Sequence, residues 1–309
     1  MIEELLGQAD AGDRRALARL LSIVENDETN ARAILRATYP RAGRARVVGV
    51  TGPPGAGKST LVSALVEAYR QDGLRVAVVA VDPTSPFSGG AILGDRIRLR
   101  ERFLDEGVFI RSMATRGSSG GLARSTGRVV TVLDAVGHDV VLVETVGVGQ
   151  EEVDVVRLVD TVCLVSVPGL GDEIQTLKAG ILEIADVLVV NKADRPGAEE
   201  AARDLAAMLT LGPDRTAWRP LIVRTVASRQ EGIGELREAL AKHDAWSRES
   251  GDRALRRREA VRVEIEGLLR EALLRRLAAR TGAALDLLVA RVAARELDPD
   301  AAVEELLAE

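Results

Sequence analysis

The chain has 309 residues, of which 46% are hydrophobic and 29% charged, a composition typical of a globular protein with a sizeable core. Its net charge of −5 and its 2% of aromatic residues argue against a surface for nucleic acid or for an anionic membrane. One cysteine and two histidines exclude a disulfide framework and a soft-metal cluster. The N-terminus lacks a signal-peptide pattern, and no stretch approaches the ~20 apolar residues of a membrane span, so we expect a cytoplasmic protein.

Residues 1 to about 40 repeat apolar side chains at helical spacing, with an interruption near Gly12, and predict short helices. From Arg46 to about His243, apolar strands alternate with amphipathic helices. Strands are expected at residues 46–51, 75–82, 108–112, 139–144, 161–167, 186–192 and 220–226. Because these are nearly continuous Val, Ile and Leu runs, they are typical of parallel strands covered on both faces. The predicted fold class is therefore α/β, with a doubly wound, mostly parallel sheet.

Beyond about Trp246 the strands stop and one long helical pattern follows, with a break expected near Thr281 and Gly282. Its apolar positions form a stripe among charges, which must be buried on the chain's own α/β domain or against a second copy. We expect a homodimer that uses this segment, and we expect the arginines in RRRE (256–259) to be a solvated helix face. The predicted domains are an N-terminal helical extension (1–44), an α/β domain (45–245) and a C-terminal helical extension that acts as a dimerisation arm (246–309).

The stretch GPPGAGKS, residues 52–59, fits the phosphate-loop pattern G-x-x-x-x-G-K-[ST], with a strand before it and a helix after it. Glycines let backbone N–H groups converge on phosphate oxygens, and the following helix presents its positive end. Lys58 can bridge the β- and γ-phosphates, while the Ser59 hydroxyl can ligate Mg²⁺. The residues expected to bind the nucleotide phosphates are Gly52, Pro53, Pro54, Gly55, Ala56, Gly57, Lys58, Ser59 and Thr60.

The sequence NKAD, residues 191–194, stands at the end of the sixth predicted strand. The Asp194 carboxylate can accept hydrogen bonds from both N1–H and the exocyclic amine of guanine, a pair of donors that adenine lacks. Lys192 can lie along the base plane, and Asn191 can tie the loops together. Downstream of a phosphate loop, this pattern indicates GTP.

Acidic residues at strand ends are candidates for the metal site. Glu144 ends the fourth predicted strand in E-x-x-G, and the N–H of Gly147 can sense the γ-phosphate. Asp82 ends the second strand, where it could instead be a turn residue, and Asp95 follows in a glycine-rich loop, where it could instead cap a helix.

Four stretches, TGPPGAGKST, VDPTSPFSGGAILGDRIRL, VETVGVGQEE and VPGLGDEIQTLKAGILEIADVLVVNKAD, together resemble the MeaB/ArgK family of P-loop GTPases. The resemblance runs in order across roughly residues 45–240. It implies a GTPase chaperone that gates adenosylcobalamin loading and protects or reactivates an acyl-CoA mutase. Because the sequence assigns neither a general base nor a catalytic arginine, we expect slow intrinsic hydrolysis that a partner stimulates. The implied ligands are Mg²⁺ and GTP or GDP, with adenosylcobalamin reaching the protein only through the partner mutase.

The resemblance also implies roles for matching positions. Lys58 would serve the phosphates and Glu144 the metal. Gly147 and Gln150 join these two as candidates for catalysis from their own positions after the strand, although Gln150 could instead be a switch or partner contact. Mg²⁺ would be surrounded by Ser59, Asp82, Asp95 and Glu144. Guanine would be read by Asn191, Lys192, Asp194 and the N–H of Ala227. This chain departs from the family at Val226, where a serine is usual.

Alternatives from other classes stay open at this point. The phosphate loop permits a nucleotide-dependent kinase that acts on a protein or a small molecule. A metallochaperone GTPase would need Cys and His ligands, which the chain hardly offers. A targeting GTPase would need a methionine-rich groove, against three methionines here, and a partitioning ATPase would lack N-K-x-D.

Overall fold

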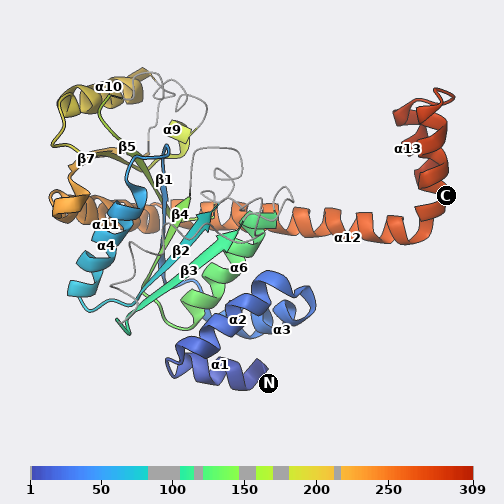
Figure 1. The fold of residues 1–309 in the computed structure, drawn as a ribbon, viewed down its shortest axis with the longest axis horizontal. Coiled ribbons are helices and arrows are strands. Elements are labelled where there is room, and N and C mark those ends of the chain that lie inside the picture. Colours follow the sequence, from blue (N-terminus) through green and yellow to red (C-terminus); the bar gives the residue numbers. More distant parts are fainter. Residues whose placement is uncertain are drawn as a thin grey trace. The chain divides into compact units, whose positions relative to one another are not determined.

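The computed structural model describes residues 2–82, 105–114, 121–145, 158–169, 181–211 and 217–308. The chain forms two compact units, Met1–Arg257 and Arg258–Glu309 (Figure 1). The first contains a seven-stranded sheet, and the second consists of helix.

The sheet has the strand order β3-β2-β4-β1-β5-β6-β7, and neighbouring strands are parallel throughout. The predicted α/β class with a doubly wound parallel sheet is confirmed, and each strand lies within two residues of its expected position. The strands are β1 Arg46–Thr51, β2 Val76–Asp82, β3 Val108–Ala114, β4 Val140–Thr145, β5 Thr161–Ser166, β6 Val187–Asn191 and β7 Leu221–Thr225.

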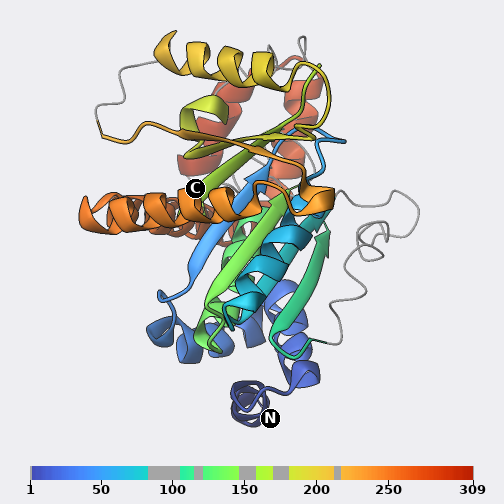
Figure 2. The ribbon, with the colours of Figure 1, turned by 90° about the vertical axis from the view of Figure 1, so that its left-hand side faces the viewer.

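Helices cover both faces of the sheet, as the continuous apolar strands require (Figure 2). On one face lie α4 (Lys58–Gln71) and α11 (Ile233–Glu249), which pack against alternate residues of the strands. The opposite face is covered by α1 (Ile2–Asp10), α2 (Arg14–Asn26), α3 (Glu28–Thr38), α6 (Gly121–Ala135) and α10 (Ala198–Leu211). Shorter helical segments are η1 (Tyr39–Arg41), α9 (Ile181–Ile184) and η3 (Ala227–Arg229).

A glycine turn and an aspartate cap separate the first two helices. α1 ends at Asp10, and Gly12 adopts a φ of 92°, which confirms the interruption expected there. The carboxylate of Asp13 then caps α2 by accepting hydrogen bonds from the backbone N–H groups of Arg15 and Ala16.

The C-terminal helix α12 (Asp252–Ala293) is continuous over 42 residues, so the break expected near Thr281 and Gly282 is wrong. A single glycine costs a helix only ~1 kcal/mol relative to alanine, and strong helix formers surround this one. The helix ends instead before Asp298, whose carboxylate caps α13 (Pro299–Ala308). No helix within the described ranges is long and apolar enough to cross a membrane.

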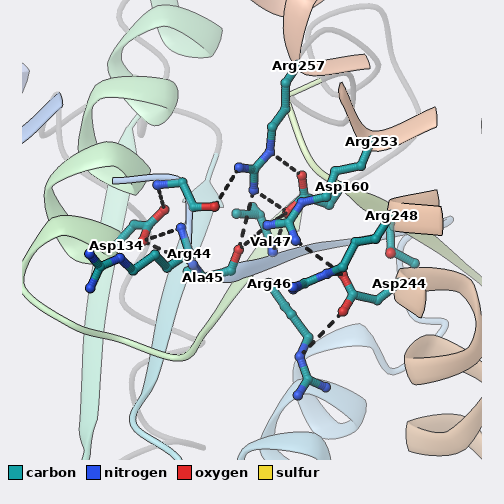
Figure 3. A network of polar contacts seen from close by, with 12 residues as sticks. Arg44, Ala45, Arg46, Val47, Asp134, Asp160, Asp244, Arg248, Arg253 and Arg257 are labelled. Carbon is teal, nitrogen blue, oxygen red and sulfur yellow. Dashed lines mark hydrogen bonds and ion pairs between the residues drawn. The ribbon is translucent and has the colours of Figure 1, made fainter. Parts of the chain in front are cut away.

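Two of the arginines expected on a solvated face are clamped to the sheet instead, so that prediction is wrong for them. Arg257 forms a two-pronged ion pair with Asp160, at 2.7 and 2.8 Å (Figure 3). Arg256 forms a two-pronged ion pair with Asp186 as well, and both of its hydrogen bonds are 2.8 Å long. Each aspartate stands directly before a strand, and only Arg258 is exposed. These ion pairs join the first turns of α12 to the starts of β5 and β6.

Candidate functional site

The phosphate loop leaves the carboxyl end of β1, between β4 and β5, where the strand order reverses and α/β folds place their ligands. Gly52, Gly55 and Gly57 have φ values of 146°, 77° and 88°, which favour glycine. A Cβ added to Gly52 would lie 2.2 Å from the backbone oxygen of Val165. One added to Gly57 would lie 2.5 Å from Nδ2 of Asn191. The loop is therefore a tight backbone cradle in which a side chain would clash at Gly52 and Gly57, whereas Gly55 is favoured by its φ alone.

Lys58 lies buried at the first turn of α4, inside this cradle. Its Nζ donates to the carbonyl oxygens of Gly52 and Pro53, at 2.8 and 3.0 Å. The lysine thus concentrates a positive charge where the helix N-terminus already favours anions. This combination suits a chain of phosphates.

Ser59 and Glu144 place two oxygen ligands side by side at the same edge of the sheet. The Ser59 hydroxyl donates to Oε1 of Glu144 at 2.5 Å, and both side chains are buried. Glu144 is fixed in register between Val50 of β1 and Ala80 of β2. Carboxylate and hydroxyl oxygens are the ligands that Mg²⁺ prefers, so these residues fit the ion.

Asn191, at the end of β6, joins three loops. Its Nδ2 donates to the carbonyl of Ala56 in the phosphate loop at 2.9 Å. Its Oδ1 accepts from the Thr225 hydroxyl at 3.1 Å and from the Ala227 N–H at 3.2 Å. The phosphate loop, the N-K-x-D loop and the segment after β7 are therefore held together by one amide.

The next residues of this loop lie beside the cradle. Lys192 has a φ of 56°, an uncommon value for a residue with a side chain, and its Nζ donates to the carbonyl of Gly55 at 2.7 Å. Asp194 is 40% exposed, and its carboxylate lies 3.5 Å from the guanidinium of Arg229. The residue expected to read guanine thus has an open carboxylate within the same cluster of loops.

Several predicted site residues fall outside this geometry. Asp95, Gly147 and Gln150 lie outside the described residues. Asp82 is the last residue of β2, opposite Ala114 of β3, and its side chain is likewise outside the described part.

Three side chains of this region were not singled out from the sequence. Thr225 donates to Asn191, and Arg229 approaches Asp194. Thr145, the residue after Glu144, donates to the hydroxyl of Thr51 at 2.9 Å, and both threonines are fully buried. Thr145 and Thr225 end β4 and β7, and this position was the available signal, because strand ends converge at the same edge of a parallel sheet. Arg229 lies in η3 and offered no such signal.

The sequence of this chain is similar to those of known proteins over most of its length. Residues 17–282 match the family model described as methylmalonyl Co-A mutase-associated GTPase MeaB. A putative GTPase from Pyrococcus abyssi is 49% identical, with 100% of this chain and 97% of the relative covered. The GTPase ArgK of Escherichia coli is 37% identical, with 77% of this chain and 75% of that protein covered.

A solved structure agrees with this assignment. The crystal structure of LAO/AO transport system kinase matches with a TM-score of 0.75 and 28% identity, covering 99% of this chain and 96% of that one. The family model spans the sheet, the phosphate loop and the N-K-x-D loop together, and the relatives extend over the same elements. The chain therefore belongs to the MeaB family of P-loop GTPases, which is related to the mutase-associated chaperones.

Proposed function

We propose that this protein is a GTP-hydrolysing chaperone of an adenosylcobalamin-dependent acyl-CoA mutase. The observation that carries the nucleotide assignment is the contact of the N-K-x-D loop with the phosphate loop, through Asn191 to Ala56 and Lys192 to Gly55. A base reader and a phosphate cradle joined in this way suit one guanine nucleotide. The family membership supports the mutase as partner.

Within this proposal each side chain has a defined task. Lys58 neutralises phosphate charge, while Ser59 and Glu144 hold Mg²⁺, which would balance the charge that develops on the phosphates. Asp82 and Asp95 complete the acidic surround, Gly147 senses the γ-phosphate, and Gln150 orients the attacking water. Asp194 accepts two hydrogen bonds from guanine. The Ala227 N–H would turn from Asn191 to the base oxygen.

The GTP-bound and GDP-bound states of the protein differ in the conformation of its loops, and this difference controls whether the mutase carries its cofactor. GTP orders loops that hydrolysis releases, and this switch gates adenosylcobalamin loading and protects or reactivates the partner. Adenosylcobalamin reaches the protein only through the mutase. We place the protein in the cytoplasm and propose that it is a homodimer.

Nucleotide choice is tested by Asp194→Asn, with Asp204→Asn, an exposed aspartate on α10, as the matched control. Asparagine keeps one acceptor oxygen but turns an N–H donor towards the exocyclic amine of guanine. The loss of one hydrogen bond and of the acceptor's charge weakens GTP binding by about a hundredfold or more. The asparagine can donate to the 2-oxo group of xanthine, so the variant gains affinity for xanthosine triphosphate. Equal GTP affinity in the Asp194 variant and in the control would contradict the assignment of the base site.

The partner is tested by measuring GTP hydrolysis with and without a cobalamin-dependent acyl-CoA mutase from the same cell. We expect slow intrinsic turnover, on the order of 10⁻⁴–10⁻² per second, and a clear acceleration by the mutase. A pull-down with a nonhydrolysable GTP analogue and with GDP accompanies the rates. Unchanged rates together with no recovered mutase in either nucleotide state would refute the chaperone role.

A further inference from the structure

Two buried hydroxyl groups meet where β1 and β4 end, beside the proposed nucleotide site. Thr51 is the last residue of β1, and Thr145 is the last residue of β4. The Thr145 hydroxyl donates to Oγ1 of Thr51 at 2.9 Å, and both residues are fully buried. The register of the two strands runs as far as Val50 and Glu144, so this hydrogen bond adds one further connection, made by side chains. It joins the strands at the last position of each.

The two hydroxyls lie on the face of the sheet opposite to Glu144. Leu142 packs in the core cluster that contains α4 residues, whereas Val143 packs in the cluster that contains α6 residues. Because side chains alternate between the two faces of a strand, Glu144 shares the α4 face, where it accepts its hydrogen bond from that helix. The same alternation places Thr51 and Thr145 on the α6 face. They therefore lie behind the ligand side of the strand ends.

Each threonine is joined in the chain to a different part of the site. Thr51 directly precedes Gly52, the first residue of the loop that leads to Ser59. Thr145 directly follows Glu144, which accepts from the Ser59 hydroxyl at 2.5 Å. A shift between the ends of β1 and β4 would therefore change the distance between the two side chains that fit Mg²⁺. The hydroxyl pair limits that shift.

Packing alone does not account for hydroxyl groups at this place. Val47, Val48 and Val50 fill the other buried side-chain positions of β1. Valine is β-branched like threonine and has no hydroxyl to remove from water. Replacing both partners of a buried hydrogen bond by apolar groups of the same shape is often nearly neutral or stabilising. Two valines would thus serve the stability of the strand pair, and the hydroxyls call for a role in the site.

We propose that the hydrogen bond between Thr145 and Thr51 positions Glu144 and Ser59 for the Mg²⁺ ion that accompanies the nucleotide. The inference rests on the proposed GTPase function and assigns two positioning residues to it. Each threonine acts through the residues next to it in the chain. Mg²⁺ demands short bonds in near-octahedral geometry, so a small displacement of one oxygen ligand weakens the ion.

The test compares the wild type with T51V/T145V, which removes both hydroxyls and keeps the β-branched shape. The matched control is T38V, because the Thr38 hydroxyl is equally buried but donates to the carbonyl of Ile34 within α3. The fluorescence of N-methylanthraniloyl-GDP reports nucleotide affinity in EDTA and during a titration with Mg²⁺. We expect the double variant to bind this nucleotide in EDTA within about twofold of the wild type, while its apparent Mg²⁺ affinity falls by about tenfold or more.

The rate of GTP hydrolysis over the same Mg²⁺ range separates the ion from the nucleotide. At limiting Mg²⁺ we expect kcat of the double variant to fall by about tenfold, with KM for GTP within about twofold of the wild type. High Mg²⁺ should restore most of the rate. T145S keeps the hydroxyl and should keep the Mg²⁺ affinity. T145V is measured in its place if the double variant does not fold, with the same loss expected.

Three results would overturn the inference: unchanged Mg²⁺ affinity in T51V/T145V, an equal loss in T38V, or the same loss in T145S as in the valine variants. Any of them, found with a wild type that binds and hydrolyses GTP, overturns this inference and leaves the GTPase proposal standing. A wild-type chain that binds neither GDP nor GTP would overturn both. The nucleotide affinity in EDTA thus distinguishes the two failures.

Discussion

A single amide, that of Asn191, helps to fix the spacing between the phosphate loop and the N-K-x-D loop. The side chain is buried, and its three hydrogen bonds reach Ala56, Thr225 and Ala227, residues far apart in the sequence. Replacing it would leave buried backbone groups without a partner, at ~1–3 kcal/mol for each group. The spacing of the two loops therefore depends strongly on Asn191, with the contact of Lys192 to Gly55 beside it.

His138 makes the stability of the first unit depend on pH. Its Nδ1 donates to the carbonyl of Leu133 at 2.9 Å, and the ring is buried edge-on against Phe109. Burial lowers the pKa from 6.5 to about 4, so the unfolded chain binds more protons between these values. The stability supplied by the neutral ring is complete above about pH 6.5 and is lost as the pH falls towards 4.

We expect this one residue to account for up to about 3 kcal/mol of the difference in unfolding free energy between pH 7 and pH 4. The measurement is urea unfolding followed by circular dichroism from pH 4 to pH 7.5, for the wild type and for His138→Gln. The variant should lose this part of the pH dependence and keep the part that belongs to the carboxylates. Parallel pH profiles for the two proteins would show that the buried ring is not the titrating group.

The sequence alone identifies those site residues whose conformation is set by their neighbours in the chain. Gly52 to Ser59 can be read directly, because the loop conformation is set by its own glycines and by the strand and helix beside it. Thr225 and Arg229 could not be assigned in this way, because their partners Asn191 and Asp194 lie more than thirty residues away in the chain. Only the pairing of β6 with β7 brings them together.

At the scale of elements, ion pairs attach the first turns of α12 to the sheet. Asp160 receives Arg257 in a two-pronged pair, Arg253 at 3.1 Å and the N–H of Val47 at 3.1 Å. Burial alone would raise the pKa of Asp186, but its contacts with His243 and Arg256 hold that pKa below the ordinary value. Asp186 is therefore ionised in the folded chain and depends on Arg256 for its countercharge.

Arg257→Gln tests this clamp, and Arg258→Gln, the exposed neighbour on the same helix, is the matched control. Removing Arg257 leaves a buried carboxylate short of countercharge, and we expect the unfolding free energy to fall by about 1–3 kcal/mol, since the arginine is itself partly exposed. The control should change it by less than about 0.5 kcal/mol. Urea unfolding is followed by the fluorescence of Trp218 and Trp246, which lie together in the first unit. Equal losses in the two variants would argue against the clamp.

The strands were predictable because each is buried on both faces and reads as an apolar run without regard to its neighbours. The continuity of α12 through Thr281 and Gly282 was not predictable in this way. A single glycine weakens a helix without ending it, and the helix propensity of the flanking residues decides whether the helix continues. Arg256 and Arg257 looked like a solvated face for another reason. Their carboxylate partners, Asp186 and Asp160, precede strands that lie 70 and 97 residues away in the sequence.

At the scale of the whole molecule, the two edges of the sheet serve different purposes. The carboxyl edge gathers the backbone cradle, Lys58 and Asn191, where a nucleotide is proposed to bind. The amino edge gathers the arginines, some of them clamped to aspartates and some around a cavity. The same sheet therefore separates the proposed nucleotide site from the ion pairs that hold the first turns of α12, so each can be tested without disturbing the other.

The second unit exposes an apolar stripe that a lone helix would not keep in water. Val261, Ile265, Leu269 and Leu273 recur at intervals of four residues, and the last three are more than half exposed. Monomeric proteins seldom expose a continuous apolar strip of this kind. The charges beside the stripe include pairs made within the helix, such as Arg262 with Glu259 and Arg275 with Glu271. An apolar stripe whose neighbouring charges are paired within the same helix suits contact with a second copy of that helix, which presents an identical surface.

Ile265→Glu therefore should convert a dimer into a monomer, whereas Val263→Glu should not. Val263 is as exposed as Ile265, at 60% against 58%, but it lies about 200° around the helix from it, away from the stripe. Light scattering coupled to size exclusion, from about 1 to 100 µM protein, measures the mass of each. Burying a glutamate in an apolar interface costs several kcal/mol, which shifts the dissociation constant by at least about a hundredfold. A wild-type chain that stays monomeric throughout, or two variants that dissociate alike, would rule out this stripe as the dimer interface.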